Sequence, residues 1–118
     1  MNRSRGNEMD DLYQELRAKM RQAEASLKAL KQNGIEKART EQEYQVKKRQ
    51  EYLKRKENGE AVTMINETIK GVQDVAEARF KRDVAEVVYD ANISAINLLK
   101  LEMRIIEEQI NREWGARE

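Results

Sequence analysis

Hydrophobic and small residues recur at steps of three or four along the first half of the chain, as on one face of an α-helix. The members of this stripe are Leu12, Leu16, Met20, Ala23, Leu27, Leu30, Gly34 and Ala38. Their mean spacing is about 3.7 residues, close to the period of a straight helix. We therefore expect a helix over residues 10–57, after a polar, disordered tail over residues 1–9.

Two Asn-Gly pairs, each a turn signal, fall within or just after this stretch. The stripe stays in phase across Asn33-Gly34, which favours a continuous helix, with a kink at Gly34 as the alternative. The periodic pattern stops at Asn58-Gly59, directly after a run of basic residues. Glycine after a basic last turn is typical of a helix C-terminus, so we expect the first helix to end there.

The connector over residues 58–73 contains a second, shorter helical pattern. Thr63 is placed to cap a helix from Met64 to Lys70, which Gly71 would close. Its apolar side chains are expected to fold back on the end of the first helix: Val62, Met64, Ile65 and Ile69.

A long helix is predicted over residues 74–114. Asp74 is followed three residues later by Glu77, a variant of the capping box that begins helices. Gly115 is the expected stop, and residues 116–118 are expected to fray. Trp114, the sole tryptophan, is expected to pack on Leu12 and Leu16; the alternative is an exposed anchor for a partner.

These elements predict an all-α fold: a long antiparallel helical hairpin, coiled-coil-like, with a short helix at the connection and one domain over residues 10–115. Apolar residues surround more of the second helix than one partner helix can cover. We therefore expect a homodimer with a four-helix arrangement. The candidate interface residues are Ile96, Leu99, Leu101, Met103, Ile106 and Ile110. The alternative is a first helix folded at Gly34 into a compact three-helix bundle.

Composition agrees with long helices. The 118 residues contain no proline, and 38% of them are charged. The 23 basic and 22 acidic residues leave a net charge of +1, so any attraction to nucleic acid must be local. No leader-like segment and no apolar run of about 20 residues occurs, so we expect a cytoplasmic protein that does not contact a membrane.

Basic residues gather where the two long helices are expected to meet the connector. They are Lys47, Lys48, Arg49, Lys54, Lys56, Arg55, Arg79, Lys81 and Arg82. Residues 44–82 contain ten basic and six acidic residues, a net +4, whereas residues 83–118 contain four and eight, a net −4. The basic end is a candidate contact for nucleic acid or an acidic partner, with Tyr44 and Tyr52 stacking on bases. The alternative is a solvated face already paired with Glu43, Glu51 and Glu77.

No catalytic constellation is found. The chain has no cysteine and no histidine, which excludes thiolate zinc sites, a cysteine nucleophile and the commonest general base. Asp83, Glu86 and Asp90 share a helical face, but Arg79 and Arg82 lie four residues before two of them, so surface ion pairs are the better interpretation. We expect no enzyme activity, no metal and no cofactor.

Three segments resemble a family of small uncharacterised helical proteins of phages and prophages of Gram-positive bacteria. They are Val62-Thr-Met-Ile-Asn-Glu-Thr-Ile-Lys-Gly71, Val75-Ala-Glu-Ala-Arg-Phe-Lys-Arg-Asp-Val-Ala-Glu86 and Glu108-Gln-Ile-Asn-Arg-Glu-Trp-Gly115. The resemblance covers most of residues 10–115 and includes no catalytic motif. It implies a phage-encoded accessory protein in the cytoplasm of a bacterial host.

Three functions follow from the resemblance and the absent catalytic chemistry. The first is a non-enzymatic protein that binds a host or phage protein, most concretely an inhibitor of a host defence nuclease of the anti-CRISPR type. The second is a nucleic-acid-binding accessory of phage recombination or replication, acting through the basic end. The third is a coiled-coil scaffold in phage assembly.

Overall fold

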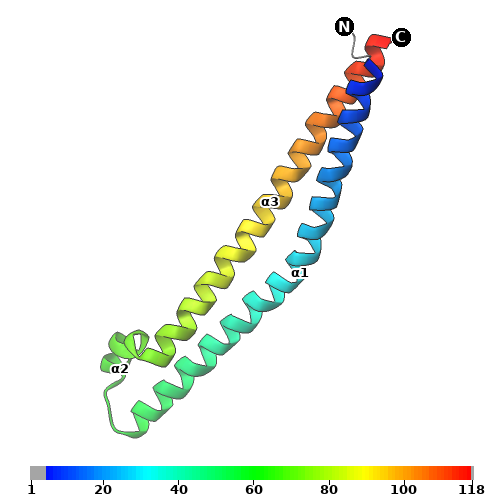
Figure 1. Ribbon diagram of the computed structural model, residues 1–118. Coiled ribbons are helices and arrows are strands. Elements are labelled where there is room, and N and C mark those ends of the chain that lie inside the picture. Colours follow the sequence, from blue (N-terminus) through cyan, green and yellow to red (C-terminus); the bar gives the residue numbers. More distant parts are fainter. Residues whose placement is uncertain (1–4, 118) are drawn as a thin grey trace. The chain divides into compact units, whose positions relative to one another are not determined.

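The computed structural model describes residues 5–117, with side chains from residue 8 to 116, and consists of helices joined by short turns (Figure 1). The elements are α1 (Arg5–Glu57), α2 (Val62–Thr68), the 3-10 turn η1 (Ile69–Gly71) and α3 (Gln73–Arg117). No strand occurs among residues 5–117, and the prediction of an all-α fold is confirmed.

Contacts divide the chain into two compact units, which are described separately below. Unit 1 comprises residues 1–30 and 91–118, and unit 2 comprises residues 31–90. The single domain expected over residues 10–115 stays a prediction.

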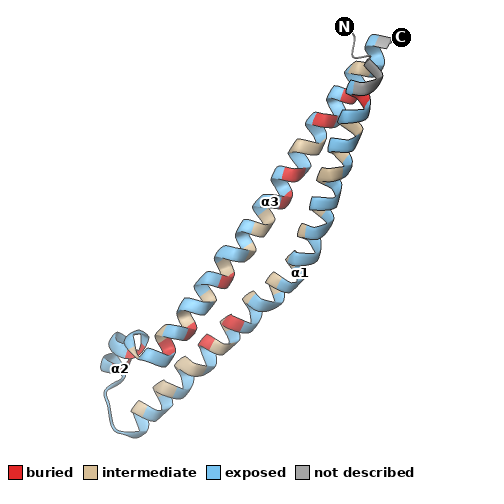
Figure 2. Ribbon diagram, viewed as in Figure 1, coloured by how far each residue is buried: buried red, intermediate tan, exposed pale blue. Residues whose placement is uncertain are grey.

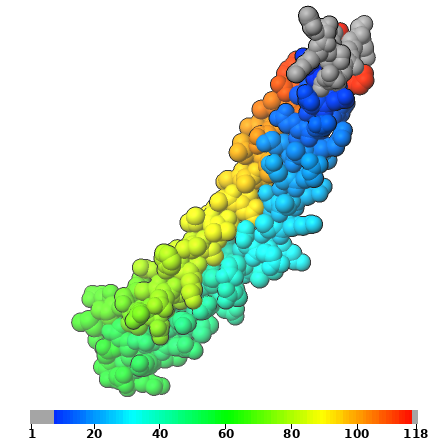
Figure 3. All heavy atoms as spheres, in the orientation of Figure 1, coloured from blue at the N-terminus to red at the C-terminus, as the bar shows by residue number. Residues whose placement is uncertain are grey.

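The α1 and α3 segments of unit 1 run antiparallel and lie side by side, blue and orange in Figure 3. Three polar contacts join them: Trp114 Nε1 donates to Tyr13 Oη (3.1 Å), Lys19 Nζ meets Glu102 Oε2 (2.9 Å), and Asn92 Nδ2 donates to the Ser26 carbonyl (3.0 Å). As the α1 residue number rises from 13 to 26, the α3 partner falls from 114 to 92, which defines the direction.

Helix α1 has a row of buried or half-buried side chains at alternating steps of three and four (Figure 2). This inner seam of α1 comprises Met9, Leu12, Leu16, Lys19, Ala23, Ser26 and Leu30 in unit 1, then Asn33, Lys37, Thr40, Tyr44, Lys47 and Glu51 in unit 2. The predicted apolar stripe was wrong at Met20, Leu27 and Ala38, which are exposed. A seam of period 3.5 takes Lys19 and Ser26 instead, because the heptad and not polarity decides which positions face the partner helix.

The inner seam of α3 follows the same heptad. Its members are Val75, Ala78, Arg82, Ala85, Tyr89, Asn92, Ile96, Leu99, Met103, Ile106 and Ile110, all buried or half-buried. In unit 2 this seam meets α1 where Lys37 Nζ lies 4.6 Å from the centre of the Tyr89 ring. Thr40 is buried there, and its hydroxyl donates to the carbonyls of Glu36 and Lys37, so it has partners in its own helix.

Helix α1 begins five residues earlier than predicted, at Arg5 instead of residue 10. Met9 is buried with Ile106 and Ile110 in the main apolar cluster of unit 1. This burial extends the helix into the expected tail, so the tail over residues 1–9 was wrong for residues 5–9. Residues 1–4 and 118 lie outside the described residues.

The predicted end of α1 at Asn58-Gly59 is confirmed. Gly59 has a φ of 85°, and its N–H donates to the Lys56 carbonyl (3.0 Å), while the Glu60 N–H donates to the Arg55 carbonyl (3.1 Å). These two bonds form a Schellman motif. By contrast, α1 passes through Asn33-Gly34 without a break, as the in-phase pattern predicted.

Helix α2 begins at Val62, so the predicted Thr63 cap was wrong. Ala61 precedes the helix in an extended conformation without a side-chain capping bond. Ile65 and Ile69 are buried as expected, whereas Val62 and Met64 are exposed. Burial of the two isoleucines, four residues apart on one helical face, sets the position of this element more strongly than a hydroxyl cap.

Both predicted ends of α3 shift. The helix begins at Gln73, which places Asp74 inside the first turn instead of at the cap, where its charge still favours the positive helix end. It continues through Gly115 to Arg117, so Gly115 does not stop it. A left-handed glycine cap needs a positive φ, and among the described residues Gly59 alone has one.

Candidate functional site

The candidate site lies in unit 2, where the predicted basic residues separate into those with acidic partners and those without. Tyr44 is buried in an apolar cluster with Val75 and Ala78. The Arg82 guanidinium lies 4.4 Å from the centre of its ring, and Lys48 Nζ lies 5.7 Å from it. With only 3% of its surface exposed, Tyr44 holds cations inside the unit and is not available to stack on a base.

Arg82 has its charge compensated within unit 2. Its Nη2 lies 2.9 Å from Asp83 Oδ1, and its Nη1 lies 3.5 Å from Glu41 Oε2. The hydrogen bond to Asp83 is the main cause that raises the pKa of Arg82 above its ordinary value, and the charge of Glu41 adds to it. Arg82 therefore joins α1 to α3 and is a poor candidate for a partner contact.

Arg55 is also occupied. Its guanidinium forms an ion pair with Glu60, across the Schellman motif that ends α1. This hydrogen bond raises the pKa of Arg55 and lowers the pKa of Glu60. An apolar contact between these two positions frequently accompanies a Schellman motif, and here an ion pair takes its place.

The remaining seven predicted basic residues have no carboxylate within 4.0 Å among the side chains that the structure describes. They are Lys47, Lys48, Arg49, Lys54, Lys56, Arg79 and Lys81. The alternative in which glutamates pair with them is not supported, because Glu43 meets Arg39 (3.7 Å) and Glu77 accepts a hydrogen bond from Gln73 (3.3 Å).

Part of this set converges on one face of α1. A cavity of about 180 Å³ is lined by Lys48, Arg49 and Tyr52. The other lining residues are Gln45 of α1, Ile69 of η1 and Asn66 of α2. The Arg49 guanidinium and Lys56 Nζ lie 5.4 and 5.9 Å from the centre of the Tyr52 ring. We call Lys48, Arg49, Tyr52, Lys56 and Asn66 the basic face. Two cations beside amide donors suit a phosphate or carboxylate group.

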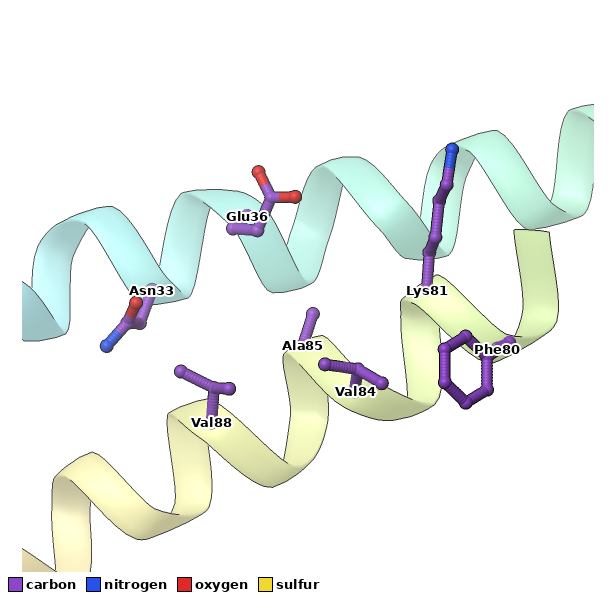
Figure 4. A pocket seen from close by; sticks show the side chains of 7 residues that line it. All are labelled: Asn33, Glu36, Phe80, Lys81, Val84, Ala85 and Val88. Carbon is purple, nitrogen blue, oxygen red and sulfur yellow. The ribbon is translucent and has the colours of Figure 1, made fainter. Parts of the chain in front are cut away.

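The basic face does not include all the predicted residues. Lys81 lines a different cavity of unit 2, with Phe80 and Val84 of α3 and Asn33 and Glu36 of α1 (Figure 4). Sequence reasoning missed Asn66, because its proximity to Lys48 depends on how α2 folds against α1.

Four of the six residues predicted for an oligomer interface are buried within the chain, and the interface itself stays a prediction. Ile96, Leu99, Ile106 and Ile110 are buried in the inner seam of α3, within unit 1 of their own chain. Met103 is half-buried in that seam, and only Leu101 is exposed. Helix α1 covers the face of α3 that carries these four residues, and Leu101 lies on the opposite face.

The other candidate residues have simple structural surroundings. Asp83 pairs with Arg82, and no three acidic side chains among the described residues converge as metal ligands do. Trp114 is half-exposed and donates to the hydroxyl of Tyr13, the neighbour of the predicted contact Leu12. Within residues 5–117 no helix has the length and apolar character to cross a membrane.

No protein-family model, curated protein or solved structure matches this chain. The phage-protein resemblance and the functions that it implies therefore stay predictions.

Proposed function

We propose that this chain is a non-enzymatic binding protein that engages an anionic macromolecular partner through the basic face. The observation that carries the proposal is the pair Lys48 and Arg49, which line one cavity beside Tyr52 and Asn66 without an acidic partner within 4.0 Å among the described residues. By contrast, the nearby cations Arg55 and Arg82 form ion pairs with glutamate and aspartate side chains. Cations with and without an acidic partner therefore occur within the same unit.

Nucleic acid is the first partner to test. Cations that contact phosphates release condensed counterions, and affinity then falls steeply as salt increases. Of the two predicted stacking residues, only half-buried Tyr52 is available to a base, and Arg49 and Lys56 lie near its ring. This arrangement favours phosphate contacts over base stacking, and therefore binding with little sequence preference.

The test measures binding to labelled single-stranded and double-stranded DNA and to RNA across a salt series. We expect Lys48→Glu/Arg49→Glu to weaken binding by at least about tenfold and to reduce the salt slope. The matched control is Lys28→Glu/Lys31→Glu, which makes the same charge change on exposed positions of α1. Equal losses in both variants would show that net charge matters and the basic face does not. No binding at low salt would remove nucleic acid as the partner.

An acidic protein surface is the second candidate partner. The phage-protein resemblance motivates its concrete form, an inhibitor of a host defence nuclease. Affinity capture on host extract with the wild-type chain tests it, and Lys48→Glu/Arg49→Glu is the matched bait. A nuclease recovered by the wild type and lost from the variant would support this form; recovery by both baits would contradict it.

We further propose that the antiparallel segments of the two units belong to one long hairpin, which dimerises into a four-helix arrangement. Antiparallel packing of α1 and α3 within each unit supports the hairpin. Because Ile96, Leu99, Ile106 and Ile110 are buried within one chain, we propose a dimer interface on the opposite side of α3.

A further inference from the structure

Helix α3 carries a second heptad row that α1 does not cover. Each member lies two residues after a member of the inner seam, which at about 100° per residue places it on the opposite side of the helix. This outer seam comprises Phe80, Val84, Val87, Ala91, Ser94, Leu98, Leu101 and Ile105. The steps alternate between four and three throughout, so the row is a coiled-coil repeat and not a set of scattered apolar residues.

All members of the outer seam are exposed in the unit to which they belong. In unit 2 the exposed fractions of Phe80 and Val87 reach 68% and 67%, and in unit 1 that of Leu98 is 58%. Phe80 and Val84 border a cavity of about 250 Å³, and Figure 4 shows their side chains with that of Val88 on α3. A partner helix that packs on such a repeat removes its large apolar side chains from water.

We propose that this row docks antiparallel on the same row of a second copy of the chain. The two-fold axis would pass between Asn92 and Ile93. A residue of one copy then lies in the same layer as a residue of the other copy when their numbers sum to 185. The layers pair large side chains with large and small with small: Phe80 with Ile105, Val84 with Leu101, Val87 with Leu98, and Ala91 with Ser94. The interface is isologous, so each layer occurs twice.

Charges beside the outer seam agree with this register. Each four-residue step of the row has two flanking positions: the residue directly after its first member and the residue directly before its second member. In an antiparallel pair, each flanking position faces the equivalent position of the other copy, one kind on either side of the row. The resulting flanking pairs are Lys81 with Glu102, Asp83 with Arg104, Asp90 with Asn97, and Val88 with Ala95. Both pairs of charged residues at these positions have opposite signs, and like charges meet only at the two ends of the row, where Glu77 would lie opposite Glu108.

Other registers lack this complementarity. In a parallel dimer Asp83 would face Val88, and Arg104 would face Gln109, so no opposite charges would meet. An antiparallel shift by one heptad leaves either Phe80 or Ile105 without a partner layer. The second copy is therefore favoured over an unrelated helix, because apolar size and charge match together along one self-complementary row.

The ion pairs that Glu102 and Asp83 form within the chain are compatible with the proposed pairs between copies. Lys19 binds Oε2 of Glu102, and Arg82 binds Oδ1 of Asp83, so the second oxygen of each carboxylate is available to the other copy. The inference sharpens the dimer proposed above and does not depend on the basic face. Lys48 and Arg49 lie outside the row, so the binding assay tests partner recognition independently.

The decisive experiment uses Asp83→Arg and Arg104→Asp, with association measured by analytical ultracentrifugation. Each variant alone places like charges at two symmetric sites, and we expect its self-association to weaken on the order of tenfold. An equimolar mixture restores two opposite-charge pairs, so we expect heterodimers of wild-type strength. Mixing that restores nothing would overturn this register, even if the protein still dimerises.

Two further variants test the apolar row itself. Leu101→Glu should give a monomer that keeps the helix content of the wild type by circular dichroism. Leu27→Glu is the matched control, because Leu27 is a comparably exposed leucine on α1, and it should leave association unchanged. A wild-type chain that is monomeric, or equal losses in both variants, would overturn the proposal.

Discussion

Two glycines in this chain have opposite roles, and the backbone decides which is which. Gly59 has a φ of 85° in the Schellman motif, where a side chain costs about 1–2 kcal/mol. Gly34 lies inside α1, and a methyl group there would meet Tyr89 Cε2 at 3.5 Å, an ordinary van der Waals distance. Both belong to Asn-Gly pairs, so the local sequence signal alone did not separate a helix end from a helix interior.

We expect Gly59→Ala to lower the free energy of unfolding by about 1–2 kcal/mol. Gly34→Ala should raise it by about 0.4–1 kcal/mol, because alanine reduces the freedom of the unfolded chain. Urea unfolding of the two variants measures both effects. Changes of the same sign would contradict the assignment of these glycines.

Glu60 makes the end of α1 sensitive to acid. Its pKa lies below the ordinary value of 4.5 because Arg55 donates a hydrogen bond to its carboxylate. A folded-state pKa below the unfolded value means that the pair stabilises the fold above about pH 4.5. That contribution is lost as pH falls through the lower folded-state pKa.

We expect Arg55→Gln to raise the pKa of Glu60 toward its ordinary value, measured by the NMR titration of its carboxyl carbon. Glu60→Gln should remove part of the acid dependence of the melting temperature. Lys54→Gln, one residue away on an exposed position, is the control and should leave the titration of Glu60 unchanged. An unchanged Glu60 pKa in Arg55→Gln would show that another group sets it.

At the scale of elements, α2 is defined by what it buries. Ile65 is fully buried and its neighbour Met64 is half-exposed, although both were expected to fold back on α1. We expect Ile65→Ala to cost about 2–5 kcal/mol of stability and Met64→Ala less than about 0.5 kcal/mol. Thermal unfolding compares the two, and a similar cost for both would mean that α2 does not hold this position in solution.

Element types were predictable here, but element ends were less so. The long helices follow from periodicity and from the absence of proline, which act within a few residues. The end at Gly59 followed from local chemistry as well. The starts of α1 and α2 were misplaced because burial of Met9 and Ile65 outweighs capping signals, and burial depends on residues far along the chain.

At the scale of the whole molecule, α1 and α3 each pass through both compact units without a break. We expect the units to unfold together, as the predicted single domain requires. Fluorescence of Trp114, the sole tryptophan, reports on unit 1, and far-ultraviolet circular dichroism reports on both units. Coincident urea transitions would support one cooperative domain; an earlier change in either signal would show two.

The basic composition of the candidate site could be predicted from the sequence, but which basic residues belong to it could not. Nine basic residues were visible in the sequence, yet only contacts across helices show which of them are compensated. Arg82 pairs with Glu41, which lies 41 positions earlier in the chain, and Tyr44 is enclosed by residues of α3. The partner of Lys19 likewise lies on the other helix, since Lys19 Nζ meets Glu102 of α3.

The helical fold, the turn at Gly59 and the concentration of basic residues in residues 44–82 could all be predicted from the sequence. These features depend on local propensity and spacing, which each segment carries with it. Which face of α3 meets α1 depends on packing between the helices, and this packing makes Ile96 and Ile106 core residues while Leu98 and Ile105 stay on the surface. The two faces of α3 are both apolar, so periodicity could not choose between them; packing against the inner seam of α1, with Met9 beside Ile106 and Ile110, made the choice.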